Sequence, residues 1–211
     1  HILDPAFRIL PIDYPSEVEC SMSTVWSGFF QQAEIPDSFP PSSIVHFKFP
    51  GKDGHPDIQL TWMDGGLLPE RPEELGPDEP LGSWDGGVIF EGTKGTLLAD
   101  CYGANPRLIP TSRMNTEKLP EPSLPRVPEG HYVQWVNACM QGYGKGVTSS
   151  PFEFAGPFTE AILMGNLAIR SYNHKVKNNK GQDTYPGRKK LLWDAKNMKI
   201  TNFDDANAFV K

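Results

Sequence analysis

The chain has 211 residues, 38% of them hydrophobic and 22% charged, which is typical of a soluble globular protein with enough chain for one well-cored domain. A formal net charge of −6, with no basic stripe interleaved with aromatics, argues against nucleic acid as a partner, and no apolar run reaches the length of a membrane span. Three dispersed cysteines, Cys20, Cys101 and Cys139, favour buried or half-buried thiols over a disulfide framework or a metal pair, and leave the compartment, cytoplasmic or periplasmic, open.

The first quarter of the chain has the pattern of a short helix followed by strands. Asp4–Leu10 begins with Asp and Pro, which suit the start of a helix. Val18–Trp26 alternates between apolar and polar residues and predicts a half-buried strand. Ile44–Phe49 and Ile58–Trp62 predict two further strands, joined by a hairpin loop around 51–54.

A long irregular stretch, 64–87, is rich in Gly, Pro and acidic residues, and loops of this length are usually functional or disordered. Short strands are predicted at Val88–Glu91, Thr96–Ala99 and Arg107–Ile109, before a Pro-rich stretch at 120–128.

Helical periodicity appears only in the second half of the chain. Tyr132, Trp135, Val136, Cys139 and Tyr143 fall on one face of a predicted helix, and the glycines at 142–146 are expected to end it.

The strongest helical signal is Phe158–Tyr172, which follows a predicted connector at Pro151–Pro157. This helix is apolar almost all round, so we expect it to be sandwiched between two layers. Asn173–Lys190 is predicted to be a solvated loop, and the chain from Leu191 is predicted to end in an extended piece and a helical turn near Asp204–Val210.

Strands first and helices later predict an α+β fold, with an open, mainly antiparallel sheet and helices on one face. The uncovered face would be mixed, which suits a symmetric interface, so we predict a homo-oligomer through this sheet face. Its polar members would be Glu19, Ser21, Ser23, Gln59 and Thr61, and its apolar members Val25, Ile44 and Met63.

Motifs that hold cofactors or metals are absent from the sequence. Dinucleotide binding needs Gly-x-Gly-x-x-Gly directly after a strand, whereas the glycines at 142–146 have other spacing and follow a helix. No phosphate loop, His-Glu-x-x-His zinc helix or nucleophile elbow is present, and the five histidines lack metal-ligand spacing. We therefore expect no cofactor and no metal to be bound by this chain itself.

Several stretches, in order along most of the chain, resemble the bacterial type of the Gfo/Idh/MocA oxidoreductases, which includes glucose-fructose oxidoreductase and inositol dehydrogenase. They are His1–Phe7, Leu60–Gly66, Arg71–Leu75, Gly87–Gly95, Gly130–Cys139, Phe154–Glu160 and Trp193–Lys199. Any one stretch would be weak, but the set is specific.

The resemblance implies a two-domain protein whose N-terminal Rossmann domain binds NAD or NADP. Residues 1–211 would form its C-terminal substrate-binding and oligomerisation domain, with a fold like the C-terminal domain of glyceraldehyde-3-phosphate dehydrogenase. The family's reactive lysine lies in a Glu-Lys-Pro motif that this sequence lacks. We therefore expect this chain to be inactive alone.

The expected activity of the complete protein is oxidation or reduction of a sugar, a polyol or a derivative. One alternative is a glycosidase of the same fold that uses NAD in a transient oxidation. Another is a non-catalytic sugar-binding or assembly module.

Within the resemblance, His1 matches the family's acid/base histidine, and Asp4 matches the acidic residue three positions later. An imidazole titrates near neutral pH and can take a proton from a carbinol, so His1 is the catalytic candidate for the complete protein. In the isolated chain a flexible end residue is the better explanation. Asp4 is better explained as a helix cap.

Four residues are candidates for substrate binding: Trp62, Asp64, Arg71 and His131. Aromatic rings stack on sugar faces, and carboxylates and guanidinium groups bind hydroxyls. Structural alternatives are a core position for Trp62, turn chemistry for Asp64 and a helix start for His131 with Trp135 one turn later.

Overall fold

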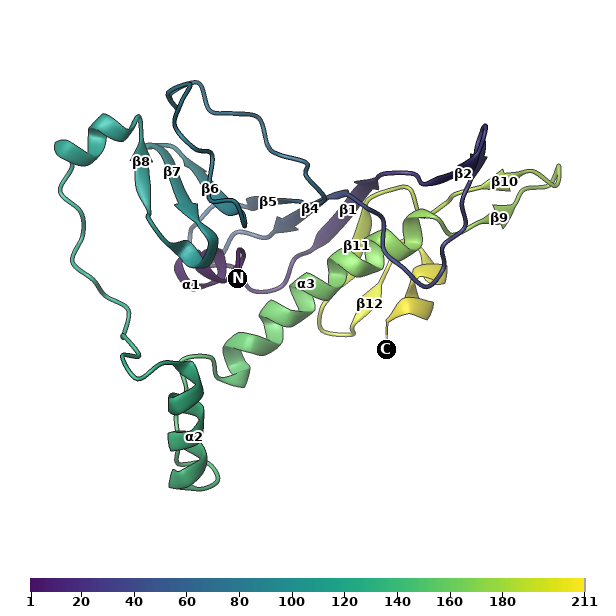
Figure 1. Cartoon of the computed structure of the whole chain (residues 1–211). Coiled ribbons are helices and arrows are strands. Elements are labelled where there is room, and N and C mark those ends of the chain that lie inside the picture. Colours follow the sequence, from purple (N-terminus) through teal and green to yellow (C-terminus); the bar gives the residue numbers. More distant parts are fainter. Residues whose placement is uncertain (211) are drawn as a thin grey trace. The chain divides into compact units, whose positions relative to one another are not determined.

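A computed structural model describes residues 1–210, and the chain divides into two compact units. Unit 1 contains His1–Pro5 and Arg71–Pro157, and unit 2 contains Ala6–Glu70 and the chain from Phe158 onward. Helices are combined with open, antiparallel sheets, so the predicted α+β class is confirmed (Figure 1).

Unit 2 is built on a five-stranded sheet in the order β12-β11-β1-β4-β5, with every neighbouring pair antiparallel. Its strands are β1 (Glu17–Met22), β4 (Ser43–Phe49), β5 (Ile58–Met63), β11 (Leu191–Asp194) and β12 (Lys199–Ile200). The strands predicted around 44–49 and 58–62, and the extended piece after Leu191, are confirmed.

One face of this sheet forms the core of unit 2 with two helices, α1 (Asp4–Ile9) and α3 (Phe152–Tyr172). Phe7 of α1 packs edge-on against Phe49 at 5.6 Å between ring centroids. On α3, a Cβ at Gly165 would lie 3.2 Å from the Phe47 ring, so the helix approaches the sheet closely at this glycine. Buried apolar side chains on this face contribute roughly 1.5–3 kcal/mol each. They include Val18, Val45, Phe47, Phe49, Leu191, Trp193 and Ile200.

The opposite face of the sheet carries polar side chains among a few apolar ones, as predicted. The register places Glu19 opposite His46, and His46 opposite Thr61, on this face. His46 Nδ1 and Thr61 Oγ1 lie 3.1 Å apart in a hydrogen bond. Ser21, Gln59 and Thr61 are exposed, whereas Ser23 and Val25 lie beyond the end of β1.

The helix α3 begins six residues earlier than the sequence suggested, so the predicted connector at Pro151–Pro157 is wrong. The amides of Phe154 and Ala155 already bond the Pro151 carbonyl at 3.0 and 2.9 Å. Pro157 lies inside the helix, where its missing N–H costs one hydrogen bond near the helix start without ending the helix. The predicted sandwich is also wrong for the described residues, because Ile162 and Leu163 on the far side of α3 are exposed.

Two small hairpins leave the sheet of unit 2. The strand predicted at Val18–Trp26 ends at Met22, because β4 begins at Ser43 and offers no partner beyond the Met22–Ser43 pair. Trp26–Gly28 (β2) and Gln31–Gln32 (β3) instead pair with each other. The segment predicted as a loop at 173–190 is solvated but contains a hairpin of β9 (Val176–Lys177) and β10 (Asp183–Thr184). The last turn is the 3-10 helix η3 (Asp204–Phe209), in agreement with the prediction.

Unit 1 contains a three-stranded antiparallel sheet of β6 (Gly87–Gly92), β7 (Gly95–Asp100) and β8 (Arg107–Ile109), as predicted. Leu98 and Ile109 are buried together with Leu75, which comes from the long irregular stretch after residue 64. That stretch therefore covers a sheet and supplies part of the core. Two 3-10 turns, η1 (Cys101–Gly103) and η2 (Thr111–Asn115), follow β7 and β8.

The helix α2 (His131–Gln141) of unit 1 forms as predicted and ends at Gly142, which has a φ of 91°. Its apolar stripe is exposed, including Trp135, Val136, Cys139 and Met140. Helical periodicity thus predicts the helix, but nothing else in the described part of unit 1 covers this stripe.

Candidate functional site

His1 lies against a turn of unit 1. Its carbonyl oxygen accepts a hydrogen bond of 3.1 Å from the Tyr102 amide, and the two rings are 4.5 Å apart between centroids. Tyr102 has φ 62° and ψ 13°, the left-handed region that non-glycine residues seldom adopt and that occurs at functional sites. Tyr102 therefore contacts His1 through both its backbone amide and its ring.

Two glycines allow the rest of the His1–Pro5 segment to pack closely against unit 1. A Cβ at Gly86 would lie 3.0 Å from the Ile2 side chain, and one at Gly103 would lie 3.0 Å from the Pro5 ring. Both glycines also have positive φ, 112° and 71°. Within unit 1, this segment is consequently held in close contact with the ends of β6 and β7. Asp4 is the first residue of α1, where a carboxylate favours helix formation.

Trp62 and Asp64, both candidates for sugar binding, are bonded to each other. Trp62 Nε1 donates to Asp64 Oδ2 at 2.9 Å. The buried Ser43 donates its amide to Asp64 Oδ1 at 2.6 Å and its hydroxyl to Oδ2 at 2.9 Å. The carboxylate therefore ties the end of β5 to the start of β4.

Arg71 braces its own loop. Its guanidinium donates to the backbone carbonyls of Gly76 and Glu79. The Glu79 carboxylate accepts hydrogen bonds from the Thr111 hydroxyl and, at 2.8 Å, from the Gly76 amide. These two bonds, that of Thr111 first, lower the pKa of Glu79. Arg71 accordingly holds the chain that covers the sheet of unit 1.

His131 is the first residue of α2 and is exposed, with its ring 4.1 Å from that of Tyr132. His1, Arg71 and His131 all belong to unit 1, but no interaction found within residues 1–210 joins one of them to another. The structure thus brings together only Trp62 and Asp64 among the predicted site residues.

The three thiols differ in environment. Burial, with a smaller contribution from the neighbouring Glu19, raises the pKa of Cys20 to about 12, so this thiol is protonated at neutral pH. Cys101 is buried, whereas Cys139 is exposed on α2. The expectation of buried or half-buried thiols is therefore wrong for Cys139. No group of three or more His, Cys, Asp or Glu side chains within 1–210 is arranged to hold a metal ion.

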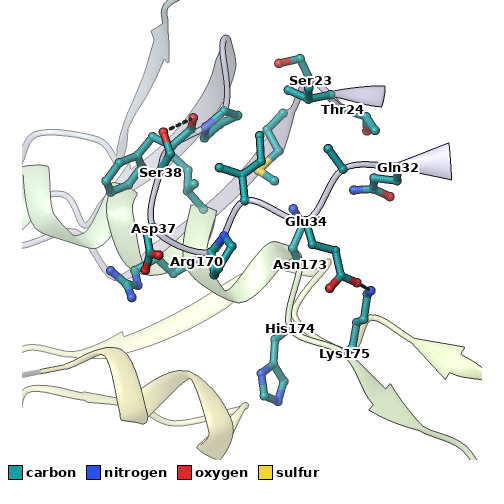
Figure 2. A pocket seen from close by; sticks show the side chains of 18 of the residues that line it. Ser23, Thr24, Gln32, Glu34, Asp37, Ser38, Arg170, Asn173, His174 and Lys175 are labelled. Carbon is teal, nitrogen blue, oxygen red and sulfur yellow. Dashed lines mark hydrogen bonds and ion pairs between the residues drawn. The ribbon is translucent and has the colours of Figure 1, made fainter. Parts of the chain in front are cut away.

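An open cavity of about 690 Å³ lies in unit 2, between the chain that follows β1 and the C-terminal end of α3 (Figure 2). Sequence reasoning missed it, because its lining comes from two segments that lie far apart in the sequence, 22–40 and 169–209. The apolar part of its lining comprises Met22, Val25, Ile35, Phe39, Ile169 and Phe209. Four charged residues, Glu34, Asp37, Arg170 and Lys175, and the imidazole of His174 stand beside this apolar lining.

Most of these polar side chains have partners inside unit 2. Figure 2 shows Glu34 and Lys175 joined across the cavity, and this hydrogen bond is the main cause that raises the pKa of Lys175. His174 Nε2 lies 3.2 Å from Asp205 Oδ2, and the Arg170 guanidinium stacks 5.2 Å from the centre of the Phe209 ring. The cavity therefore suits an uncharged or amphipathic group that needs apolar contact.

The described residues contain no Rossmann-type cradle for a dinucleotide. Every strand pair within 1–210 is antiparallel, whereas the cradle for a pyrophosphate is built by parallel strands joined through a glycine-rich turn and a helix. Within the same residues, no helix combines the length and apolarity needed to cross a bilayer. No protein-family model matches the chain, and no curated protein is significantly similar to it.

Proposed function

We propose that this chain is the substrate-side domain of an NAD(P)-dependent oxidoreductase acting on a sugar, a polyol or a derivative of one. The observation that supports this most is the ordered set of stretches resembling the Gfo/Idh/MocA family, in a chain of α+β class with an open antiparallel sheet. The nicotinamide cofactor would be held by another domain, because the residues described do not fit it.

Three of the resembling stretches, Leu60–Gly66, Phe154–Glu160 and Trp193–Lys199, carry side chains whose hydrogen bonds hold the fold together. Asp64 and Trp62 fasten the end of β5, and Trp193 Nε1 donates to the Glu160 carboxylate at 2.8 Å between β11 and α3. The likeness therefore concerns residues that define the fold. This favours an architecture shared with the Gfo/Idh/MocA family. His1 remains the candidate for the catalytic acid/base in this chain.

In the proposed reaction, His1 accepts the proton of a substrate hydroxyl as the carbinol is oxidised. An imidazole suits this step because its pKa lies near neutral pH. The Tyr102 contact and the close fit of Ile2 and Pro5 on Gly86 and Gly103 fix the backbone of the His1 segment, which favours a defined position of the base.

The decisive experiment uses the complete protein encoded by the gene, with a panel of sugars and polyols and with NAD or NADP. We expect net reduction of the cofactor with at least one substrate. The His1→Gln variant should lose roughly a hundred- to ten-thousand-fold in rate, together with the limb of the pH profile that reports the imidazole, because general acid–base catalysis contributes that much. His55→Gln, in an exposed loop of unit 2, is the matched control and should keep the parent rate.

Other outcomes would replace this proposal. Cleavage of a glycosidic bond without net cofactor reduction would assign a glycosidase. Sugar binding without turnover would assign a binding or assembly module. For the present chain alone, calorimetry should find no NAD or NADP binding tighter than about 1 mM, and a micromolar dissociation constant would overturn the assignment of domains.

A further inference from the structure

The hairpin formed by β2 and β3 has a bare aromatic tip. Trp26, Phe29 and Phe30 are 58%, 93% and 83% exposed, and the rings of Phe29 and Phe30 contact each other at 4.4 Å between centroids. A cluster of this kind on a protruding element is typical of an interaction surface. We call these three residues the aromatic tip.

The backbone of the tip is unusual for its residues. Phe30 has φ 52°, a conformation that glycine or asparagine adopts at turns with far less cost than a bulky residue. A two-residue turn between β2 and β3 would have less backbone strain with glycine or asparagine in place of Phe30. The strain suggests that an aromatic side chain is needed here for binding.

The tip is held away from its own unit. Trp26 pairs with Gln32 and Gly28 with Gln31, and the Ala33 amide bonds the Val25 carbonyl at 2.8 Å. Figure 1 shows this hairpin and the β9–β10 hairpin extending from the same end of unit 2, and the Lys175–Glu34 ion pair braces the bases of the two. Since the chain at the base of the hairpin lines the cavity, the short paired strands prevent the tip from folding back into it.

We propose that the aromatic tip inserts into the open cavity of a second copy of this chain, and that the exchange is reciprocal. The cavity of about 690 Å³ falls in the range of about 300–1,000 Å³ that encloses drug-sized groups, which is ample for two phenyl rings. Its wall offers Ile35, Phe39 and Phe209 as apolar partners. Reciprocal insertion places the same patch on both copies and closes the pair with two-fold symmetry.

Charge also favours a protein partner of this kind. Residues 25–33 carry no charged side chain, so insertion buries no unpaired ion, and the only charges in 23–42 are Glu34 and Asp37. The exchange differs from the sheet-face contact expected from the sequence, and the two together would give a tetramer with two kinds of two-fold interface.

The test is the mass of the chain in solution at micromolar concentration, by light scattering and sedimentation. The wild type should be at least a dimer. The double variant Phe29→Ser/Phe30→Ser should lose one step of assembly, with the dissociation constant rising about 30-fold or more, as for a hot-spot residue. Trp84→Ser, which removes an aromatic side chain that is 98% exposed in unit 1, is the matched control and should keep the wild-type mass.

A second variant separates insertion into the cavity from contact between two tips. Ile35→Arg places a charge on an exposed part of the cavity wall and should weaken assembly as the tip variant does. Mixing the tip variant with the cavity variant should restore mixed pairs, because one copy retains an intact cavity and the other an intact tip. Far-ultraviolet circular dichroism checks that each variant is folded.

Three results would overturn the proposal: a monomeric wild type, a tip variant with unchanged mass, or a mixture that forms no mixed pairs. Binding of a monomeric wild type to vesicles of phosphatidylcholine and phosphatidylglycerol would assign the tip to a membrane instead.

Discussion

The long helices of the two units differ in how their apolar side chains are covered. In unit 2, Trp193 is 8% exposed and donates a hydrogen bond to Glu160 beneath the sheet. In unit 1, Trp84 and Trp135 are exposed although they belong to the same residue class. The difference is whether a second layer is present: α3 lies on the sheet of unit 2, whereas the apolar stripe of α2 meets no second layer within the described part of unit 1. Periodic apolar residues in the sequence therefore indicate a surface that could be buried, but burial also requires a second element that packs against it.

The largest effect expected from this comparison is at the centre of the unit 2 core. Phe49 is 1% exposed, between Phe7 and Phe47. Phe49→Ala should lower the free energy of unfolding by about 3–5 kcal/mol, because it removes a buried ring and leaves a cavity. Urea unfolding followed by circular dichroism measures this loss. Phe152→Ala, at an exposed site at the start of α3, should change stability by less than about 0.5 kcal/mol.

The core of unit 1 should respond nearly as strongly. Leu98 is fully buried against Leu75 and Ile109, so Leu98→Ala should cost about 2–5 kcal/mol. Hydrogen exchange gives the location of the loss. We expect faster exchange of amides in β6, β7 and β8, and little change in β1, β4 and β5. Equal acceleration in both sets would show that the two units unfold as one cooperative body, and the comparison between them would lose its energetic basis.

The sequence was most informative where side-chain periodicity is complete. Alternation over Ile44–Phe49, and helical spacing over Tyr132–Cys139, each predict an element that the structure contains. Periodicity fails to predict where a strand ends. Beyond Met22, β1 has no further pairing with β4, and the chain forms the separate β2–β3 hairpin. Pro157 misled in another way, because a proline close to a helix start costs one hydrogen bond and need not end the helix.

The candidate site could be predicted only as a set of residue types. Trp62, Asp64 and Arg71 have side chains that suit a sugar, but each makes hydrogen bonds within the protein. Asp64 accepts hydrogen bonds from Ser43 and Trp62. Arg71 donates to the carbonyls of Gly76 and Glu79. Ser43 lies 21 residues from Asp64, and the two carbonyls lie 5 and 8 residues from Arg71, so no local sequence pattern predicts these bonds. The cavity of unit 2 was missed for a similar reason, since its lining comes from segments more than a hundred residues apart in the sequence, 22–40 and 169–209.

An intermediate effect is expected at Asp64, where the structural and ligand-binding roles differ in outcome. Asp64→Asn keeps the volume but replaces one acceptor oxygen with a donor facing other donors, so unfolding free energy should fall by about 1–3 kcal/mol. Ser43→Ala removes only one of the three donors and should cost less, about 0.5–1.5 kcal/mol. If Asp64→Asn leaves stability intact and instead weakens binding of a sugar, the carboxylate is a ligand contact and the structural role is wrong.

The smallest effect should come from Trp135 on α2. Its ring is 63% exposed and helps to form the bare stripe of that helix. Trp135→Ala removes little buried area and introduces the best helix former, so the free energy of unfolding should change by no more than about 0.5 kcal/mol. The same substitution at Trp193, with its buried ring and its bond to Glu160, provides the contrast and should cost about 3–5 kcal/mol. Urea unfolding of both variants at low protein concentration, where self-association is minimal, measures the difference. A loss above about 2 kcal/mol for Trp135→Ala would mean that the stripe of α2 is packed in solution, and the two units would then differ much less in how they cover their apolar side chains.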